Sequence, residues 1–115
     1  MPFPETIRAL PYASLLGIDV YVQESAAGQV LFMELPAGRA PVVVPTHTHG
    51  EEWGIVAEGE IEMTLGDRPE RHPAGAIHCI PAGLPHSFRF HPGTSSVHYF
   101  AERRVTPGPP RAPAP

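Results

Sequence analysis

The chain of 115 residues lacks several groups on which whole classes of mechanism depend. It contains no lysine, so its eight basic residues are all arginines, which excludes Schiff-base chemistry and a P-loop lysine. Its single cysteine, Cys79, rules out an internal disulfide, and we expect it to be a small buried core residue. No apolar run is long enough to span a membrane and no signal-peptide pattern begins the chain, so we expect a cytoplasmic protein without a membrane partner.

Length and charge narrow the choice further. A chain of this size has room for one domain with one modest core, which we place in residues 1–105 with its core at about 15–102. The formal net charge is −4 and the arginines are scattered, so nucleic acid is not an expected partner. Residues 106–115 hold five prolines and little to bury, and we interpret them as an extended or disordered tail, with an arm to a partner chain as the alternative.

What the chain has in abundance is turn residues. Sixteen prolines and eleven glycines separate short segments rich in Val, Ile, Phe and Tyr, a texture typical of an all-β sandwich or barrel. One short helical turn is expected near residues 4–10, because Pro4 suits the first helical position and Pro11 stops the helix. About eight strands are expected: residues 17–23, 29–35, 42–44, 53–57, 60–65, 77–81, 86–91 and 97–101.

Two histidines in an H-x-H pattern are the first candidates for chemistry. His47 and His49 follow a strand-like segment, and residues two apart on a strand share a face, so both imidazoles can converge on one ion. Gly50 comes next and allows the chain to turn and present a carboxylate beside them, from either Glu51 or Glu52. Strict alternation favours Glu51. Two exposed loop histidines beside a solvated acidic pair are the alternative reading.

The segment from His47 to Gly59 resembles the first motif of the cupin family, H-x-H followed by a spacer, Glu, six residues and Gly. Glu52 stands six residues before Gly59, which matches, and the family spacing therefore favours Glu52 over Glu51. The spacer after His49 is two residues instead of three or four. Small cupins with an H-x-H-x2-Gln/Glu-Trp-Gly arrangement share this shortening.

A second stretch resembles the other cupin motif, G-x5-P-x-G-x2-H-x3-N. Gly75, Pro81, Gly83 and His86 stand at its spacings, and Phe90 takes the place of the Asn. On a strand that begins at His86, the side chains of His86, Phe88 and Phe90 share one face. We therefore expect a drier pocket wall than the motif specifies, and a ligand with an apolar or aromatic part.

The resemblance implies a double-stranded β-helix, the jelly-roll barrel of the cupins. It implies one divalent transition metal on His47, His49, Glu52 and His86, which Mn, Fe, Co, Ni, Cu and Zn would all suit. It also implies a homodimer. The pocket wall is expected from Trp53, Met63, Phe88 and Phe90.

Neither the fold nor the ligands choose the function. The leading hypothesis is a metal-dependent enzyme that acts on a small organic molecule, with its catalytic residues unknown. The alternatives are a small-molecule binding or sensor module without turnover, and a purely structural metal site.

The remaining histidines carry less weight. His72 and His91 each precede a proline and are expected in solvent. His78 and His98 lie on expected strands, where either one can face inward as an acid or base, although we expect this of neither.

Overall fold

The computed structural model describes residues 3–111 and confirms an all-β chain with one short helical turn. Eleven strands are found in this part of the chain, more than the eight or so expected. The elements in order are α1 (Glu5–Arg8), β1 (Pro11–Leu15), β2 (Ile18–Ser25), β3 (Gly28–Leu35), β4 (Val42–His47), β5 (Glu52–Glu58), β6 (Glu60–Leu65), β7 (Arg68–Pro73), β8 (Ile77–Ile80), β9 (His86–Phe90), β10 (Thr94–Phe100) and β11 (Gly108–Pro110).

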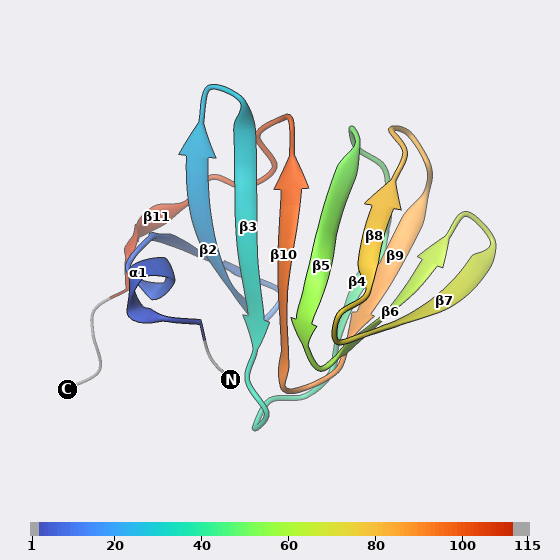
Figure 1. The fold of residues 1–115 in the computed structure, drawn as a ribbon, viewed down its shortest axis with the longest axis horizontal. Helices are drawn as coiled ribbons and strands as arrows, with labels where there is room; N and C mark the ends of the chain where they lie inside the picture. The colour runs from blue at the N-terminus through green and yellow to red at the C-terminus, as the bar shows by residue number, and fades with distance from the viewer. Residues whose placement is uncertain (1–2, 112–115) are drawn as a thin grey trace.

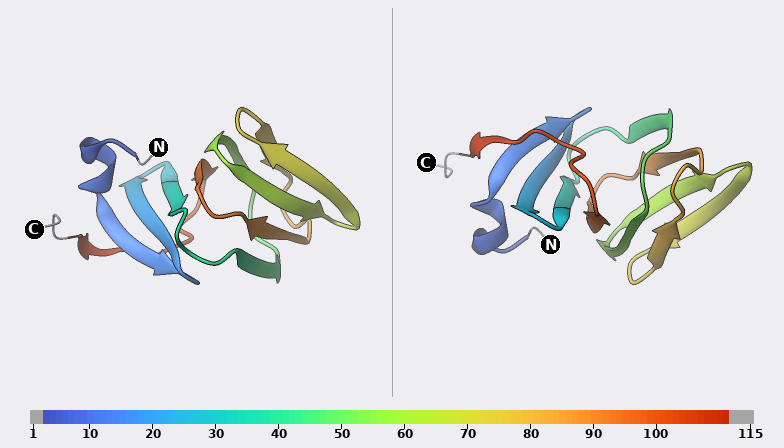
Figure 2. Two further views of the ribbon diagram at one scale, coloured as in Figure 1. Left: turned by 90° about the horizontal axis from the view of Figure 1, so that it is seen from below. Right: turned by 90° about the horizontal axis from the view of Figure 1, so that it is seen from above.

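The strands form two antiparallel sheets, as Figures 1 and 2 show. The larger sheet has seven strands in the order β11-β1-β2-β3-β10-β5-β8, and the smaller has four in the order β4-β9-β6-β7. Several neighbours are distant in the sequence, since β10 lies between β3 and β5 and β9 lies between β4 and β6. This arrangement brings β4, which ends at His47, and β9, which begins at His86, side by side.

Alternation along each strand separates the core from the surface. In β5, Glu52, Gly54 and Val56 are buried while Trp53 and Ile55 are exposed. Residues 53–57 and 60–65, joined at Glu58 and Gly59, are expected from the sequence to form a hairpin, and this expectation was wrong. Strand β5 pairs with β10 and β8, whereas β6 pairs with β9 and β7, so the two strands lie in different sheets. The chain crosses from one sheet to the other at Gly59, whose φ of +80° disfavours other residues and where a Cβ would meet the backbone oxygen of Gly93 at 2.7 Å.

Register, and not residue type, decides the burial of β8. His78 and Ile80 face inward, while Ile77 and Cys79 are exposed. The expectation that Cys79 is buried was therefore wrong, because it rested on the usual preference of cysteine. The expectation that His72 is exposed was also wrong, because it rested on the proline that follows and not on the strand register. His72 lies on the inner face of β7 and is only 8% exposed.

Three strands were not predicted. Strand β1 follows the helix directly and pairs with β2 through a turn at Leu16 and Gly17, both of which have positive φ. A leucine in this position hides the usual hairpin signal, which is Asn-Gly or Asp-Gly. Strand β7 contains two prolines, which are tolerated because it is an edge strand paired only with β6. Pro4 caps the helix instead of beginning it.

The third of these strands corrects the expectation of a loose tail. Over Gly108–Pro110 the chain forms β11, which pairs with β1 at the sheet edge. Arg111 continues this contact, with Nη1 3.2 Å from the carboxylate of Asp19 and 3.3 Å from the Tyr21 hydroxyl. The sequence does not reveal this strand, because its prolines bury little apolar surface. Pairing with the sheet edge and one ion pair hold it in place. Residues 112–115 lie outside the described residues.

Within residues 3–111 the one helix spans a single turn, so no helix there is long and apolar enough to cross a bilayer.

Candidate metal centre

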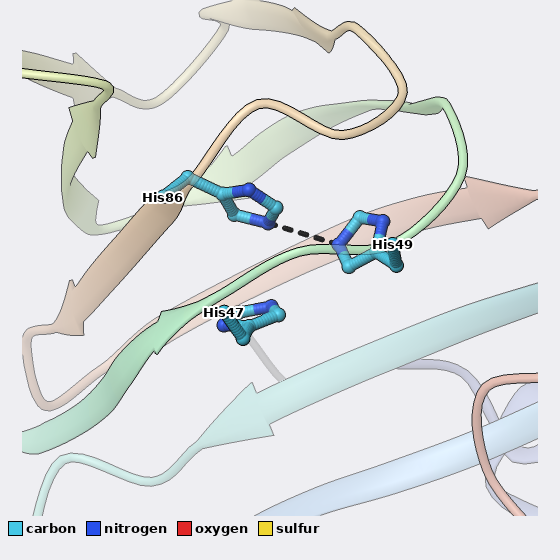
Figure 3. Close-up of side chains that lie close together, drawn as sticks. All are labelled: His47, His49 and His86. Atoms are coloured by element: carbon cyan, nitrogen blue, oxygen red, sulfur yellow. Dashed lines mark hydrogen bonds between the residues drawn. The ribbon is translucent and has the colours of Figure 1, made fainter.

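Three histidines from β4, the loop after it and β9 lie together. His47 ends β4 and is the register partner of His86, the first residue of β9, after an irregularity between Val44 and His47. Ring centroids of His47 and His86 are 4.3 Å apart, and those of His49 and His86 are 4.5 Å apart. Figure 3 shows the three rings turned toward one another. The H-x-H pattern and the second motif thus meet in space.

Each of these rings is fixed by a backbone carbonyl behind it. Nδ1 of His47 lies 2.7 Å from the Pro45 oxygen, Nδ1 of His49 lies 2.6 Å from the Gly50 oxygen, and Nδ1 of His86 lies 2.8 Å from the Leu84 oxygen. A carbonyl oxygen only accepts hydrogen bonds, so every Nδ1 is the protonated donor. In the neutral rings, Nε2 therefore carries the lone pair, which is the tautomer arrangement typical of metal-ligating histidines.

Two of the three Nε2 atoms, those of His49 and His86, face other acceptors. Nε2 of His86 and Nε2 of His49 are 2.9 Å apart, along the dashed line in Figure 3, and Oε1 of Glu52 lies 3.2 Å from His49 Nε2. A hydrogen bond between the two nitrogens requires one ring to carry a second proton. Burial lowers the pKa of His86, as do His47 and His49 nearby, against an opposing effect of the Leu84 carbonyl. A cation among these acceptors resolves the conflict without that proton.

Glu52, and not Glu51, faces this cluster. Glu51 is exposed, whereas Glu52 begins β5 and is 1% exposed. Its second oxygen, Oε2, accepts hydrogen bonds from His78 Nε2 at 2.9 Å and from His98 Nδ1 at 2.7 Å. Burial by itself would raise the pKa of Glu52, but these two histidines outweigh it and hold that pKa well below its usual range. The carboxylate is therefore ionised.

The inward position of both His78 and His98 is what sequence reasoning weighted too low. They lie on β8 and β10, on either side of β5, and both are register partners of Gly54. A Cβ on Gly54 would meet His78 Cε1 at 2.8 Å, so the glycine leaves space for the ring beside Glu52. A glycine two residues after an inward Glu was the available signal.

Beside the histidines lies a cavity of about 300 Å³. His47, His49, Glu52 and His98 line its polar part, and Arg104 reaches it from the segment after β10. The remaining walls are mainly apolar, from Leu15, Leu31, Met33, Val44, Pro45, Thr46, Phe88, Phe100 and Val105.

Of the four residues expected in the pocket wall, Phe88 lines the cavity and the other three do not. Met63 and Phe90 are buried in the core. Trp53 points away from the cavity because it alternates with Glu52 on β5, and it is half exposed against the Tyr99 ring, with centroids 4.7 Å apart. The dry wall expected of Phe90 is instead provided by Phe88 and Phe100 with their aliphatic neighbours.

Arg104 is held at the cavity by its backbone. Its N–H donates to Oε1 of Gln29 at 2.7 Å, as does the N–H of Val105 at 3.0 Å, and Gln29 itself is buried. The guanidinium lies 5.8 Å from the Phe100 ring centroid. Arg104 is an exposed residue of the cavity lining, and among residues 3–111 no carboxylate pairs with its guanidinium.

Two comparisons with known proteins agree with this fold, and a third finds nothing. A cupin-domain family model matches residues 31–101, while no curated protein matches the chain. Among solved structures, KdgF from a Halomonas species superposes with a TM-score of 0.69 at 18% identity, over 81% of this chain and 86% of that one.

Two larger enzymes share the fold. Oxalate decarboxylase of Bacillus subtilis, which has Mn(II) centres, gives a TM-score of 0.66 at 18% identity, over 83% of this chain and 28% of that one. Salicylate 1,2-dioxygenase of Pseudaminobacter salicylatoxidans gives 0.65 at 15% identity, over 77% and 27%. At these identities the likeness shows the fold alone. The family model covers more than half of the chain and both histidine motifs, and the chain therefore belongs to the cupin family.

Proposed function

We propose that this cupin binds one divalent transition metal on His47, His49, His86 and Glu52 and acts as a metal-dependent enzyme on a small organic anion. The observation that carries the proposal is the convergence of three imidazoles, whose Nδ1 protons are donated to backbone carbonyls, beside an oxygen of the Glu52 carboxylate. Such a set of three imidazoles and one carboxylate suits first-row divalent metals without selecting among them.

The cavity supports the choice of ligand. Arg104 offers a positive charge without a carboxylate partner in the described part of the chain, and the lining other than Arg104, the histidines and Glu52 is mainly apolar. An organic anion with an apolar middle matches both features. The metal would polarise an oxygen of the ligand or activate bound water or dioxygen. Phe88 and Phe100 would exclude water, and Arg104 would orient the anionic group.

Elemental analysis and titration calorimetry with Co²⁺, Mn²⁺ and Zn²⁺ test the metal site. We expect one equivalent of metal per chain. His86→Ala should lose most of the metal affinity, because it removes a proposed ligand atom, the Nε2 that lies beside Nε2 of His49. His91→Ala is the matched control, since that ring lies on the surface beside Glu62. Full metal retention in His86→Ala would overturn the assignment.

A binding or sensor module without turnover is the second candidate. Of His78 and His98, only His98 lines the cavity. Both of its ring nitrogens already have partners, Glu52 and Ser96, so this histidine offers no free acid or base to a ligand. A panel of small carboxylates and phenolates separates the two. An enzyme converts a member of the panel when metal and oxygen are supplied, whereas a binder only raises the melting temperature.

We also propose that the protein is a cytoplasmic homodimer. The support for the dimer is an apolar outer face on β5 and β8, where Trp53 is 50% exposed, Ile55 39% and Ile77 75%. Strand β8 is the edge of the larger sheet, so a second copy can cover this face around a two-fold axis.

A further inference from the structure

Two buried histidines lie behind Glu52 and belong to neither cupin motif. His78 and His98 have side chains that are 0% and 1% exposed, and their rings are 5.0 Å apart between centroids. We infer that they are positioning residues, which hold the Glu52 carboxylate in the one orientation that presents an oxygen to the His47, His49 and His86 cluster. This inference rests on the proposed metal site and adds a function for two residues outside it.

The two oxygens of the Glu52 carboxylate have different partners. Oε2 accepts from both His78 Nε2 and His98 Nδ1, which uses both of its lone pairs. Oε1 is left on the opposite side, 3.2 Å from Nε2 of His49. Rotation of the carboxylate away from this orientation would break two charge-assisted hydrogen bonds among buried groups.

The protons of the His98 ring are ordered by a third residue. Ser96 Oγ lies 2.8 Å from Nε2 of His98, so when the serine donates there, Nδ1 carries the proton that Glu52 accepts. His78 donates through Nε2, while its Nδ1 is buried without a hydrogen-bond partner among residues 3–111. The orphaned nitrogen indicates that the ring is placed for its contact with Glu52, since its other edge gains nothing.

The backbone makes room for this arrangement. Gly54 lies between the two histidines in register, and a side chain there would meet both the Val97 carbonyl, at 1.9 Å from the Cβ, and the His78 ring. The strand therefore gives up a core side chain so that two rings can reach one carboxylate. In the first cluster every ring has a carbonyl behind it that commits Nδ1, whereas neither ring here does, which favours proton-bearing donors over a second ion.

A crossed pair of amide substitutions tests the inference. The amide nitrogen of Asn occupies the position of histidine Nδ1, and that of Gln occupies the position of Nε2. His98→Asn and His78→Gln therefore keep the donor to Glu52, while His98→Gln and His78→Asn remove it. Co²⁺ is the metal used, with affinity measured against a competing chelator and the visible Co²⁺ spectrum as a second readout.

The donor-keeping variants should bind Co²⁺ close to the wild-type affinity. The donor-removing variants should bind about 10- to 100-fold more weakly, the usual cost of losing a partner behind a metal ligand, with an altered spectrum. The variant with the higher Co²⁺ affinity should thus be Gln at position 78 and Asn at position 98. A merely structural role predicts no reversal, because it depends on volume and polarity alone.

Several results would overturn the inference. These are the same order of amides at both positions, unchanged affinity in all four variants, and a second equivalent of Co²⁺ that disappears when either histidine is replaced. Circular dichroism and a melting curve check that each variant folds, and if one position does not tolerate amides, the pair at the other position decides. If the wild-type protein itself binds no Co²⁺, the result refutes the proposed metal site instead.

Discussion

Adjacent glutamates meet opposite environments where β5 begins. Glu51 is exposed to solvent, whereas Glu52 is buried against three histidines within 3.2 Å of its oxygens. Alternation counted from His47 and His49 would have pointed Glu51 inward, but the chain leaves β4 after His47 and resumes a strand only at Glu52. The loop through Gly50 resets the register, as the family spacing implied.

This contrast predicts different effects of the same substitution at the two positions. Glu52→Gln should weaken Co²⁺ binding by about 10- to 100-fold, because it removes a buried negative charge that faces His49. Glu51→Gln should leave the affinity near the wild-type value. Titration calorimetry at neutral pH measures both, and a larger loss at position 51 would reverse the assignment.

A second residue-scale prediction concerns Gly54. Replacing it with alanine places a Cβ 1.9 Å from the Val97 oxygen and 2.8 Å from His78, and backbone cannot move away cheaply. We expect a loss of about 1–3 kcal/mol or more in the free energy of unfolding, the range for overpacked cores. Gly38→Ala is the control, since nothing lies within 4 Å of its Cβ. Denaturant unfolding compares the two, and equal stability would contradict the packing described.

The site was predictable only where residue type and spacing coincide. His47, His49 and His86 stand at family spacings, and each is held by a carbonyl one or two residues away. His78 and His98 stand at no such spacing. Their meeting at Glu52 depends on which strands neighbour β5, a long-range fact that no local pattern in the sequence reports.

At the scale of elements, the same division separates strands that were predicted from those that were not. Strands β2 to β6 and β8 to β10 carry apolar residues between turn signals and were expected with bounds within a few residues of those found. Strand β11 has no apolar pattern, and is held by pairing with β1 and by Arg111. Edge strands of this kind derive their stability from partners, so composition alone does not reveal them.

The C-terminal contact can be tested at Arg111. It is one of two arginines, with Arg39, that pair with the buried carboxylate of Asp19, and it also stacks on the Tyr12 ring at 4.8 Å. Because the Arg111 side chain is partly exposed, Arg111→Ala should cost only about 1 kcal/mol of unfolding free energy. Arg68→Ala, which loses a surface pair with Glu70, should cost less than about 0.5 kcal/mol. Hydrogen exchange in β1 should rise in the first variant alone, and equal exchange in both would contradict the contact.

At the scale of the whole molecule, the two sheets differ in what they leave uncovered. Trp53, Ile55 and Ile77 lie on the outer face of adjacent strands of the larger sheet, paired in register so that Ile55 stands opposite Ile77 and Trp53 opposite Cys79. The smaller sheet exposes Val43, at 54%, as a large apolar side chain. The uneven distribution assigns the proposed dimer contact to the β5–β8 face.

Ile77→Arg should therefore dissociate the dimer, because two-fold symmetry brings the introduced charge into the interface from both copies. Val43→Arg is the matched control, since it places the same charge at an exposed apolar site on the other sheet. Light scattering coupled to gel filtration at micromolar concentration should give a dimer for the wild type and for Val43→Arg, and a monomer for Ile77→Arg. Cys79 provides an independent probe, because the only thiol lies on this face and should react with a maleimide more slowly in the dimer than in the Ile77→Arg monomer. A monomeric wild type, or thiol reactivity that is the same in both proteins, would refute the contact and leave the apolar face to be explained by another partner.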